Sequence, residues 1–224
     1  MLKIGHRGAM GYEPENSIKA FKKAIQLKVD MIELDLRKCK SGELVIIHDY
    51  KLKGKYKKRK VSDFTLKELQ KIYSGKNEHV LKLEEALDCV KRKAKINIEL
   101  KSQNISKRLM KIIDTYVENY RWKYSDFLIS SYNHVELNQI KKLNSKLKLG
   151  LIICGIPVSK AKFAENFGAH SIHMDYEFIN KGFITDAHKR NIKVIVYTVD
   201  DPQDIKKMKK WGVDGIISDF PDRI

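Results

Sequence analysis

The chain has 224 residues, of which 42% are hydrophobic and 33% are charged, as in a globular protein with room for one large domain. No stretch approaches the ~20 consecutive apolar residues of a membrane-spanning helix, which excludes a transmembrane segment. The formal net charge of +17 favours anionic ligands without identifying one: nucleic acid, an anionic membrane surface, a phosphodiester metabolite and a lysine bias with no partner are all compatible.

A short apolar strand, Met1–Ile4, opens the chain and runs into a Gly-His-Arg-Gly sequence. Gly5 and Gly8 allow the backbone to turn sharply around His6 and Arg7 and to approach a ligand closely. Histidine transfers protons near neutral pH, and the arginine fork matches phosphate oxygens. This stretch therefore predicts a catalytic histidine beside a phosphate-binding arginine.

The strand leaves no space for a cleavable signal before His6, so the expected location is a bacterial or archaeal cytoplasm. Cysteine spacing agrees with a reducing compartment. Cys39, Cys89 and Cys154 are odd in number, lie far apart and form no CxxC pair, which predicts neither a disulfide framework nor a zinc site.

A helix is predicted over Ser17–Leu27 with Asn16 as its N-cap, followed by a strand over Met31–Arg37. Glu33 and Asp35 are two residues apart on that strand and point to the same face. Two carboxylates on one face are costly to bury, and a bound cation would relieve that cost.

The next strand, Leu44–His48, follows a turn of only a few residues around Gly42. A parallel crossover needs a dozen or more residues, so the two strands are predicted to form an antiparallel hairpin. A turn centred near Ser41-Gly42 places His48 roughly opposite Asp35 and brings a second histidine to the acids.

Residues 50–79 break the pattern and are interpreted as a small inserted cap, with a short helix over Leu66–Ile72. Residues 51–60 contain seven basic side chains in ten. Either these form a solvated loop, or they form a basic rim that attracts an anionic substrate.

Helices and strands then alternate regularly to the end of the chain. The predicted strands are Ile96–Lys101, Phe127–Ser131, Leu147–Cys154, Ser171–Met174, Lys193–Val199 and Gly215–Ser218. The predicted helices are Leu83–Arg92, Ser106–Tyr120, His134–Leu143, Ser159–Phe167, Asn180–Arg190 and Pro202–Trp211. Without the antiparallel arm of the hairpin this makes eight strands, so we predict a single (β/α)8 TIM-barrel domain over residues 1–224.

Barrel active sites lie at the C-terminal ends of the strands, where the acids of the second and third barrel strands fall. Glu33, Asp35 and Glu99 offer three carboxylates, an oxygen-only set that suits Mg²⁺ or Ca²⁺. Salt bridges to Arg7, Lys101 or Arg37 are the alternative use of these acids. With a metal present, His6 and His48 are the candidate general acid and base, and Arg7 and Lys101 would share the phosphate charge.

Four short sequences in this order resemble the glycerophosphodiester phosphodiesterases: HRG at 6–8 with PENS at 14–17, IELD at 32–35, HD at 48–49 and IELK at 98–101. The resemblance covers essentially the whole chain. It implies cleavage of a glycerophosphodiester to glycerol 3-phosphate and an alcohol, with the glycerol 2-hydroxyl as a plausible internal nucleophile.

The resemblance also implies residue roles. Those matching Glu33, Asp35 and Glu99 bind the metal, those matching His6 and His48 act as acid and base in an order left open, and those matching Arg7 and Lys101 contact phosphate. The chain departs from the family at Tyr197, where tryptophan is common, and at Val80–Leu83, which often carries Pro-Thr. Tyr197 is expected to contact the substrate and to alter its preference.

Two alternatives remain at this stage. The same site could cleave lysophospholipids as a lysophospholipase D, which an exposed apolar rim near the insertion would favour. The +17 charge could instead serve a non-catalytic module that binds anionic surfaces or nucleic acid, although no nucleic-acid motif is present. The expected partner is a small phosphodiester, with at most weak membrane-surface contact, and the oligomeric state stays open.

Overall fold

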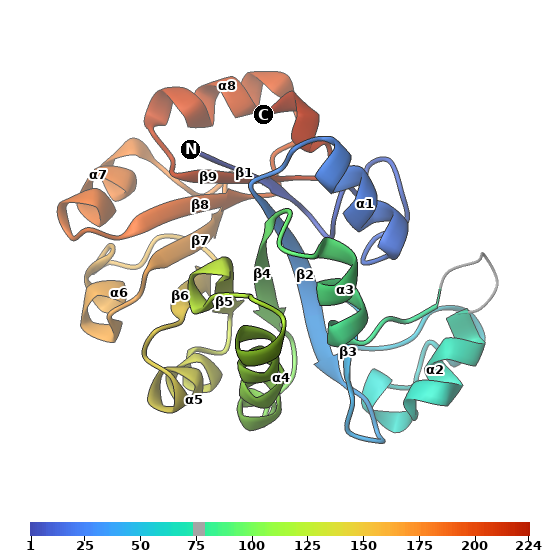
Figure 1. The fold of residues 1–224 in the computed structure, drawn as a ribbon. Coiled ribbons are helices and arrows are strands. Elements are labelled where there is room, and N and C mark those ends of the chain that lie inside the picture. Colours follow the sequence, from blue (N-terminus) through green and yellow to red (C-terminus); the bar gives the residue numbers. More distant parts are fainter. Residues whose placement is uncertain (74–78) are drawn as a thin grey trace.

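The computed structural model describes residues 1–73 and 79–224. Eight parallel strands form a closed ring, because β1 pairs with both β9 and β2, and the helices surround it (Figure 1). The ring strands are β1 (Leu2–Gly5), β2 (Met31–Lys38), β4 (Lys95–Leu100), β5 (Phe127–Ser131), β6 (Lys148–Ile153), β7 (Ser171–Asp175), β8 (Lys193–Tyr197) and β9 (Gly215–Ser218). The predicted (β/α)8 barrel is confirmed.

The helices between the ring strands lie on its outer face. They are α1 (Ile18–Gln26), α3 (Leu83–Val90), α4 (Ser106–Asn119), α5 (His134–Leu143), α6 (Lys162–Phe167), α7 (Lys181–Lys189) and α8 (Pro202–Trp211). Local capping residues explain where α8 begins and ends. Asp201 accepts hydrogen bonds from the first-turn amides, Pro202 takes the first position, and Gly212 ends the helix with a left-handed φ of 82°. Helix α6 starts three residues after the predicted Ser159.

The predicted N-cap of α1 is wrong by one residue. Ser17 Oγ accepts a hydrogen bond from Ala20 N–H at 3.1 Å and caps the helix. Asn16 instead adopts a left-handed φ of 58° and turns its side chain to Asp35, to which it donates a hydrogen bond of 3.0 Å. The motif asparagine therefore serves the site at the strand end rather than the helix.

Strand β3 (Leu44–Ile46) forms the predicted antiparallel hairpin with β2 and pairs outside the ring. Leu36 pairs with Ile46, and Ile47 N–H donates to the Asp35 carbonyl at 3.0 Å. His48 is therefore one residue beyond the predicted position opposite Asp35. The observed register centres the turn on Ser41 rather than between Ser41 and Gly42.

The insertion after β3 contains two short 3₁₀ helices, η1 (Gly54–Tyr56) and η2 (Val61–Asp63), and helix α2 (Leu66–Tyr73). It lies to one side of the barrel, beyond β3 (Figure 1). Val61, Phe64 and Leu69 are buried with β3 residues in a small cluster separate from the main core. The insertion thus packs on the hairpin, and residues 74–78 of the predicted cap lie outside the described part.

The main core fills the space between the ring and its helices. Inside the ring, Ile4, Met31, Leu128, Ile195 and Ile217 form a small apolar cluster. Towards the C-terminal end the inward positions become polar. This change of side-chain type places the charged groups at one end of the barrel.

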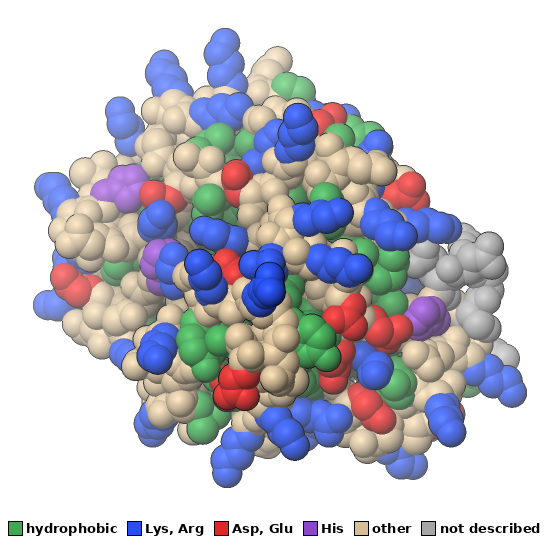
Figure 2. All heavy atoms as spheres, viewed as in Figure 1, with side chains coloured by type: hydrophobic (Ala, Val, Ile, Leu, Met, Phe, Trp, Pro, Cys, Tyr) green, Lys and Arg blue, Asp and Glu red, His purple; other side chains and the backbone are tan. Residues whose placement is uncertain are grey.

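Lysine and arginine side chains are spread over the visible face of the molecule, with acidic groups between them, rather than gathered into one stripe (Figure 2). This spread is typical of solvated surface charge rather than of a nucleic-acid groove. Among the residues that the structure describes, none of the helices combines the length and apolar character needed to cross a bilayer.

Candidate active site

The turn after β1 positions the first histidine and arginine. Gly8 has φ 92°, and a Cβ there would meet the Ala20 backbone at 2.7 Å, so only glycine fits between the turn and α1. His6 Nδ1 lies 2.6 Å from Asp219 Oδ1, which follows β9. Because β1 pairs with β9, the Asp219 carboxylate lies beside the His6 imidazole and orients it.

Three acids converge at the ends of β2 and β4. Glu33, Asp35 and Glu99 each offer an oxygen within 4.8 Å of the others, and Glu33 and Asp35 are only 3% and 1% exposed. Burial, reinforced by the neighbouring carboxylates, raises the pKa of Glu33 well above its usual range, and burial likewise raises the pKa of Glu99. Close, buried, oxygen-only donors fit a hard divalent cation such as Mg²⁺ or Ca²⁺.

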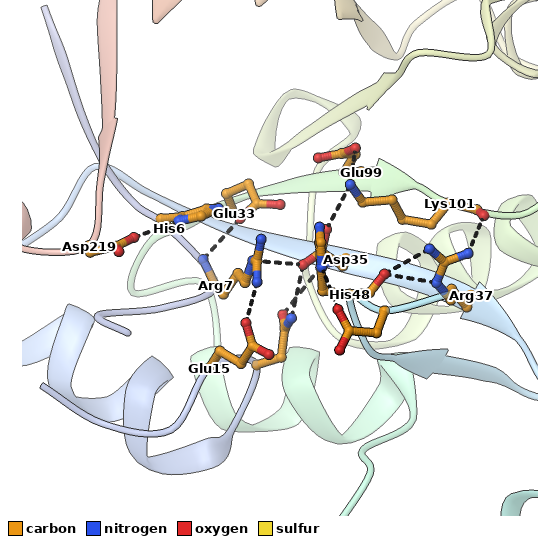
Figure 3. A network of polar contacts seen from close by, with 12 residues as sticks. His6, Arg7, Glu15, Glu33, Asp35, Arg37, His48, Glu99, Lys101 and Asp219 are labelled. Carbon is orange, nitrogen blue, oxygen red and sulfur yellow. Dashed lines mark hydrogen bonds and ion pairs between the residues drawn. The ribbon is translucent and has the colours of Figure 1, made fainter. Parts of the chain in front are cut away.

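Two cations flank the acids (Figure 3). Arg7 Nε lies 3.2 Å from Asp35 Oδ2, while Lys101 Nζ lies 2.5 Å from Glu99 and 3.4 Å from Asp35. Burial alone would lower the pKa values of Arg7 and Lys101, but the surrounding carboxylates outweigh it and raise both. The salt bridges considered as an alternative to metal binding are therefore present for Arg7 and Lys101.

The PENS segment holds these groups in place. Arg7 donates to the Glu15 carboxylate, and Arg7 N–H donates to Glu33 Oε2 at 2.9 Å. Asn16 binds the Asp35 carboxylate as described above. Glu15 and Asn16 thus orient the residues that face the cavity.

His48 approaches the acids from the hairpin. Its Nδ1 lies 3.0 Å from Asp49 Oδ1. Its backbone carbonyl accepts two hydrogen bonds from Arg37, at 2.9 and 2.7 Å, and the same guanidinium donates to the Lys101 carbonyl at 2.7 Å (Figure 3). Arg37 therefore ties the hairpin to β4 rather than pairing with the three acids.

A cavity of about 150 Å³, the barrel cavity, opens at the C-terminal end of the ring. Its lining contains the predicted site residues His6, Arg7, Glu33, His48, Glu99, Lys101 and Tyr197. Asp35 is held behind this lining by Asn16, Arg7 and Lys101. The structure thus brings all eight predicted site residues into one region.

Tyr197 stands on the wall at the β8 end. Its hydroxyl lies 2.6 Å from the Tyr132 hydroxyl, which follows β5. Burial, together with this hydrogen bond, raises the pKa of Tyr197, so the phenol stays protonated. The pair bridges two strand ends across the cavity from the hairpin.

The floor of the barrel cavity contains polar residues that sequence reasoning missed. Ser130 donates to Asn97 Oδ1 at 2.9 Å, and His173 Nε2 lies 3.0 Å from Ser171 Oγ. Burial lowers the pKa of His173 to about 3, so its ring is neutral. Asn97 and His173 both fall on the inward alternation of predicted strands, and that alternation was the available signal.

Clustered oxygen donors, flanking cations and two oriented histidines suit the transfer of a phosphoryl group, and they lie where barrel enzymes carry their chemistry. Fold and site together define a (β/α)8-barrel enzyme for phosphate esters. The sequence then gives the family: the model of the glycerophosphoryl diester phosphodiesterase family matches residues 6–223, and the chain belongs to that family.

Individual relatives agree over the full length. A glycerophosphodiester phosphodiesterase of Caldanaerobacter subterraneus subsp. tengcongensis is 36% identical over 100% of this chain and 96% of its own. A solved glycerophosphodiester phosphodiesterase of Thermotoga maritima is 25% identical with a TM-score of 0.78, covering 99% of this chain and 96% of its own.

A phosphodiesterase of Oleispira antarctica, solved with the product sn-glycerol-3-phosphate, has a TM-score of 0.85 at 24% identity, covering 99% of this chain and 94% of its own. At that identity the likeness shows the fold.

Proposed function

We propose that the protein hydrolyses glycerophosphodiesters to glycerol 3-phosphate and an alcohol, with a divalent cation held by Glu33, Asp35 and Glu99. The observation that carries the proposal is the convergence of these acids with two histidines at one cavity of a barrel that belongs to this family. The product bound in the Oleispira antarctica relative is of the same chemical class.

Metal binding fits the acid cluster better than salt bridging alone. Two cations, Arg7 and Lys101, face three carboxylates, and the raised pKa of Glu33 indicates that its charge is not fully compensated. When bound, Mg²⁺ or Ca²⁺ withdraws charge from a phosphoryl oxygen and stabilises the more anionic transition state. The carboxylate oxygens alone do not distinguish these two ions.

Arg7 and Lys101 are the proposed phosphate ligands among the side chains. Both line the barrel cavity, and both are largely buried, with side chains 15% exposed. Low solvent exposure strengthens their attraction for an anion. Their existing carboxylate contacts hold them in position for the phosphate.

The two histidines are the proposed general acid and base. Each has Nδ1 beside a carboxylate, Asp219 for His6 and Asp49 for His48. A carboxylate only accepts a hydrogen bond, so Nδ1 carries the proton and Nε2 is left to exchange a proton with the substrate. Proper placement of such a group typically contributes about 10² to 10⁴ in rate. Tyr197 faces them as a proposed contact for the substrate.

Lysophospholipid cleavage is the weaker alternative. An exposed apolar rim near the insertion would favour it, but Val61, Phe64 and Leu69 of the insertion are buried in a small cluster that includes Val45 of the hairpin. Tyr50, 52% exposed, is the large apolar side chain that stands out on the described part of the insertion. The basic side chains of Arg37 and Lys60 lie over its ring.

The test is release of glycerol 3-phosphate from glycerophosphocholine and glycerophosphoethanolamine, with Mg²⁺, Ca²⁺ or EDTA. We expect metal-dependent release by the wild type and a loss of about 10² to 10⁴ in kcat for His48→Ala and for His6→Ala. Lys58→Met, an exposed change away from both histidines, is the matched control. Release that persists in EDTA would contradict the metal assignment, and no release with either ion would overturn the proposal.

A further inference from the structure

A second cavity of about 510 Å³, the outer cavity, lies between the barrel and the insertion. Its walls come from residues 14–17 after β1, residues 46–49 at the end of the hairpin, and the C-terminal end of α2 with residues 79–80. His48 lines both this cavity and the barrel cavity. A group attached to a phosphate beside His48 therefore has a neighbouring space to occupy.

Residues of the outer cavity wall also hold the site residues. Glu15 accepts a hydrogen bond from Arg7, and Asn16 donates to Asp35. Glu15 and Asn16 thus connect the wall of the outer cavity to Arg7 and Asp35. One side of a phosphodiester fits the barrel cavity, and the other side extends past His48.

The outer cavity combines apolar and anionic surfaces. Ile47 and Ile72 contribute apolar surface and Tyr73 an aromatic ring, while Glu15 and Asp49 contribute carboxylates. Burial alone would raise the pKa of Asp49, but hydrogen bonds from His48 and Lys53 outweigh it and hold the pKa below its usual value. In a chain of net charge +17, a cavity whose wall carries two acidic side chains beside Lys53 differs from the predominantly basic composition of the chain.

The ammonium group of Lys53 lies between the carboxylates of Asp49 and Glu15. Lys53 Nζ lies 3.1 Å from Asp49 Oδ2 and 3.9 Å from Glu15 Oε1. Its side chain is 74% exposed, so it reaches this position from solvent and is free to leave it. The two carboxylates can therefore bind an ammonium that comes from elsewhere.

We propose that the outer cavity binds the alcohol part of the diester and selects alcohols that carry an ammonium group. The carboxylates of Glu15 and Asp49 attract the cation, and the isoleucines and the Tyr73 ring contact its methyl or methylene groups. The bound substrate displaces Lys53 towards solvent. This assignment rests on the proposed function, because the cavity is named by its position beside the reacting phosphate.

The test compares two substrates of the same shape. Glycerophosphocholine carries a trimethylammonium group, and the 3,3-dimethylbutanol diester of glycerol 3-phosphate replaces that nitrogen with carbon. We expect kcat/KM for the charged diester to exceed that for the neutral one by about tenfold, the size of a partly desolvated cation contact. Equal kcat/KM values, or preference for the neutral diester, would overturn the inference while leaving the proposed function intact. Absence of hydrolysis of both diesters would overturn both.

A substitution at the competing lysine sharpens the test. Lys53→Met removes the resident ammonium and should raise kcat/KM for glycerophosphocholine about threefold, with no change for the neutral diester. Lys58→Met removes the same charge from the insertion outside the cavity lining and should change neither. Equal effects of Lys53→Met on both substrates would show that Lys53 acts on the phosphate and would overturn the assignment of the cavity.

Discussion

The two ends of the barrel interior follow different rules. Nearer the N-terminal end, Ile4, Leu128 and Ile195 belong to one apolar cluster and have almost no exposed surface. At the C-terminal end, Glu33 and Asp35 are just as buried, yet they are charged and lie among other charges. Burial at the first end stabilises the fold, whereas burial at the second opposes it and is useful only for chemistry. Within one ring of strands, the residues that stabilise the fold and the charged residues of the candidate site therefore lie at different levels along the barrel axis.

The largest expected effect is at the apolar end. Leu128→Ala removes a side chain that is 2% exposed and leaves a cavity, so the free energy of unfolding should fall by about 2–5 kcal/mol. Urea unfolding measures this change. The folded fraction should keep the kcat of the wild type, and a lower kcat in fully folded protein would show that the two ends are not independent.

At the charged end, Arg37→Met should act on activity first. Its guanidinium makes three hydrogen bonds to the carbonyls of His48 and Lys101, and their loss releases both groups from the cavity wall. We expect kcat to fall about 10- to 100-fold, because small misplacements of catalytic groups are costly. Arg37→Lys keeps the positive charge but lacks the several N–H donors of the guanidinium, so its kcat should lie between those of the wild type and Arg37→Met. If Arg37→Met unfolds at lower urea but keeps its kcat, Arg37 has only a structural role.

Glu33→Gln tests whether the acids oppose folding. Removing one of three mutually repelling buried carboxylates should raise the free energy of unfolding of the metal-free protein by about 1 kcal/mol. The same variant should lose the rise in Tm that Mg²⁺ or Ca²⁺ gives the wild type. A thermal melt with EDTA and with each ion measures both. A less stable metal-free variant would indicate that the salt bridges already compensate the cluster.

The titration of His173, which lies between the two ends, contributes nothing at neutral pH and acts only as the pH falls. Its pKa of about 3 in the folded protein is below the ordinary value because of burial. Below pH ~6.5 the unfolded chain therefore takes up a proton that the folded protein excludes, and stability falls as the pH drops, by about 1.4 kcal/mol per pH unit. Above that pH both states are neutral and the contribution is constant. His173→Asn should remove this part of the slope between pH 7.5 and 5, and an identical slope in the two proteins would contradict it.

The sequence was sufficient for the ring and for the residues at its strand ends. Alternation along β2 and β4 placed Glu33, Asp35, Glu99 and Lys101 on one face, because a period of two is fixed by strand geometry. The register of the hairpin was not determined in the same way. The turn after Cys39 set it, and one residue moved His48 away from its predicted partner.

Contacts between segments distant in sequence were beyond local reasoning. Asp219 meets His6 only because the last strand closes on the first, and the pairing of Arg37 with two carbonyls depends on where the hairpin meets β4. The outer cavity likewise needs three separate segments. Such features follow from closure and packing, which a linear pattern does not contain.

Because β3 pairs with β2 outside the ring, the part of the insertion that follows Asp49 is attached to the barrel without being one of the eight ring strands. Its length and composition can change without altering the number or stagger of the strands that close the ring. The wall that the insertion gives to the outer cavity can therefore be exchanged while the ring stays the same. The ring strands that carry Glu33, Asp35 and Glu99 are unaffected by such an exchange.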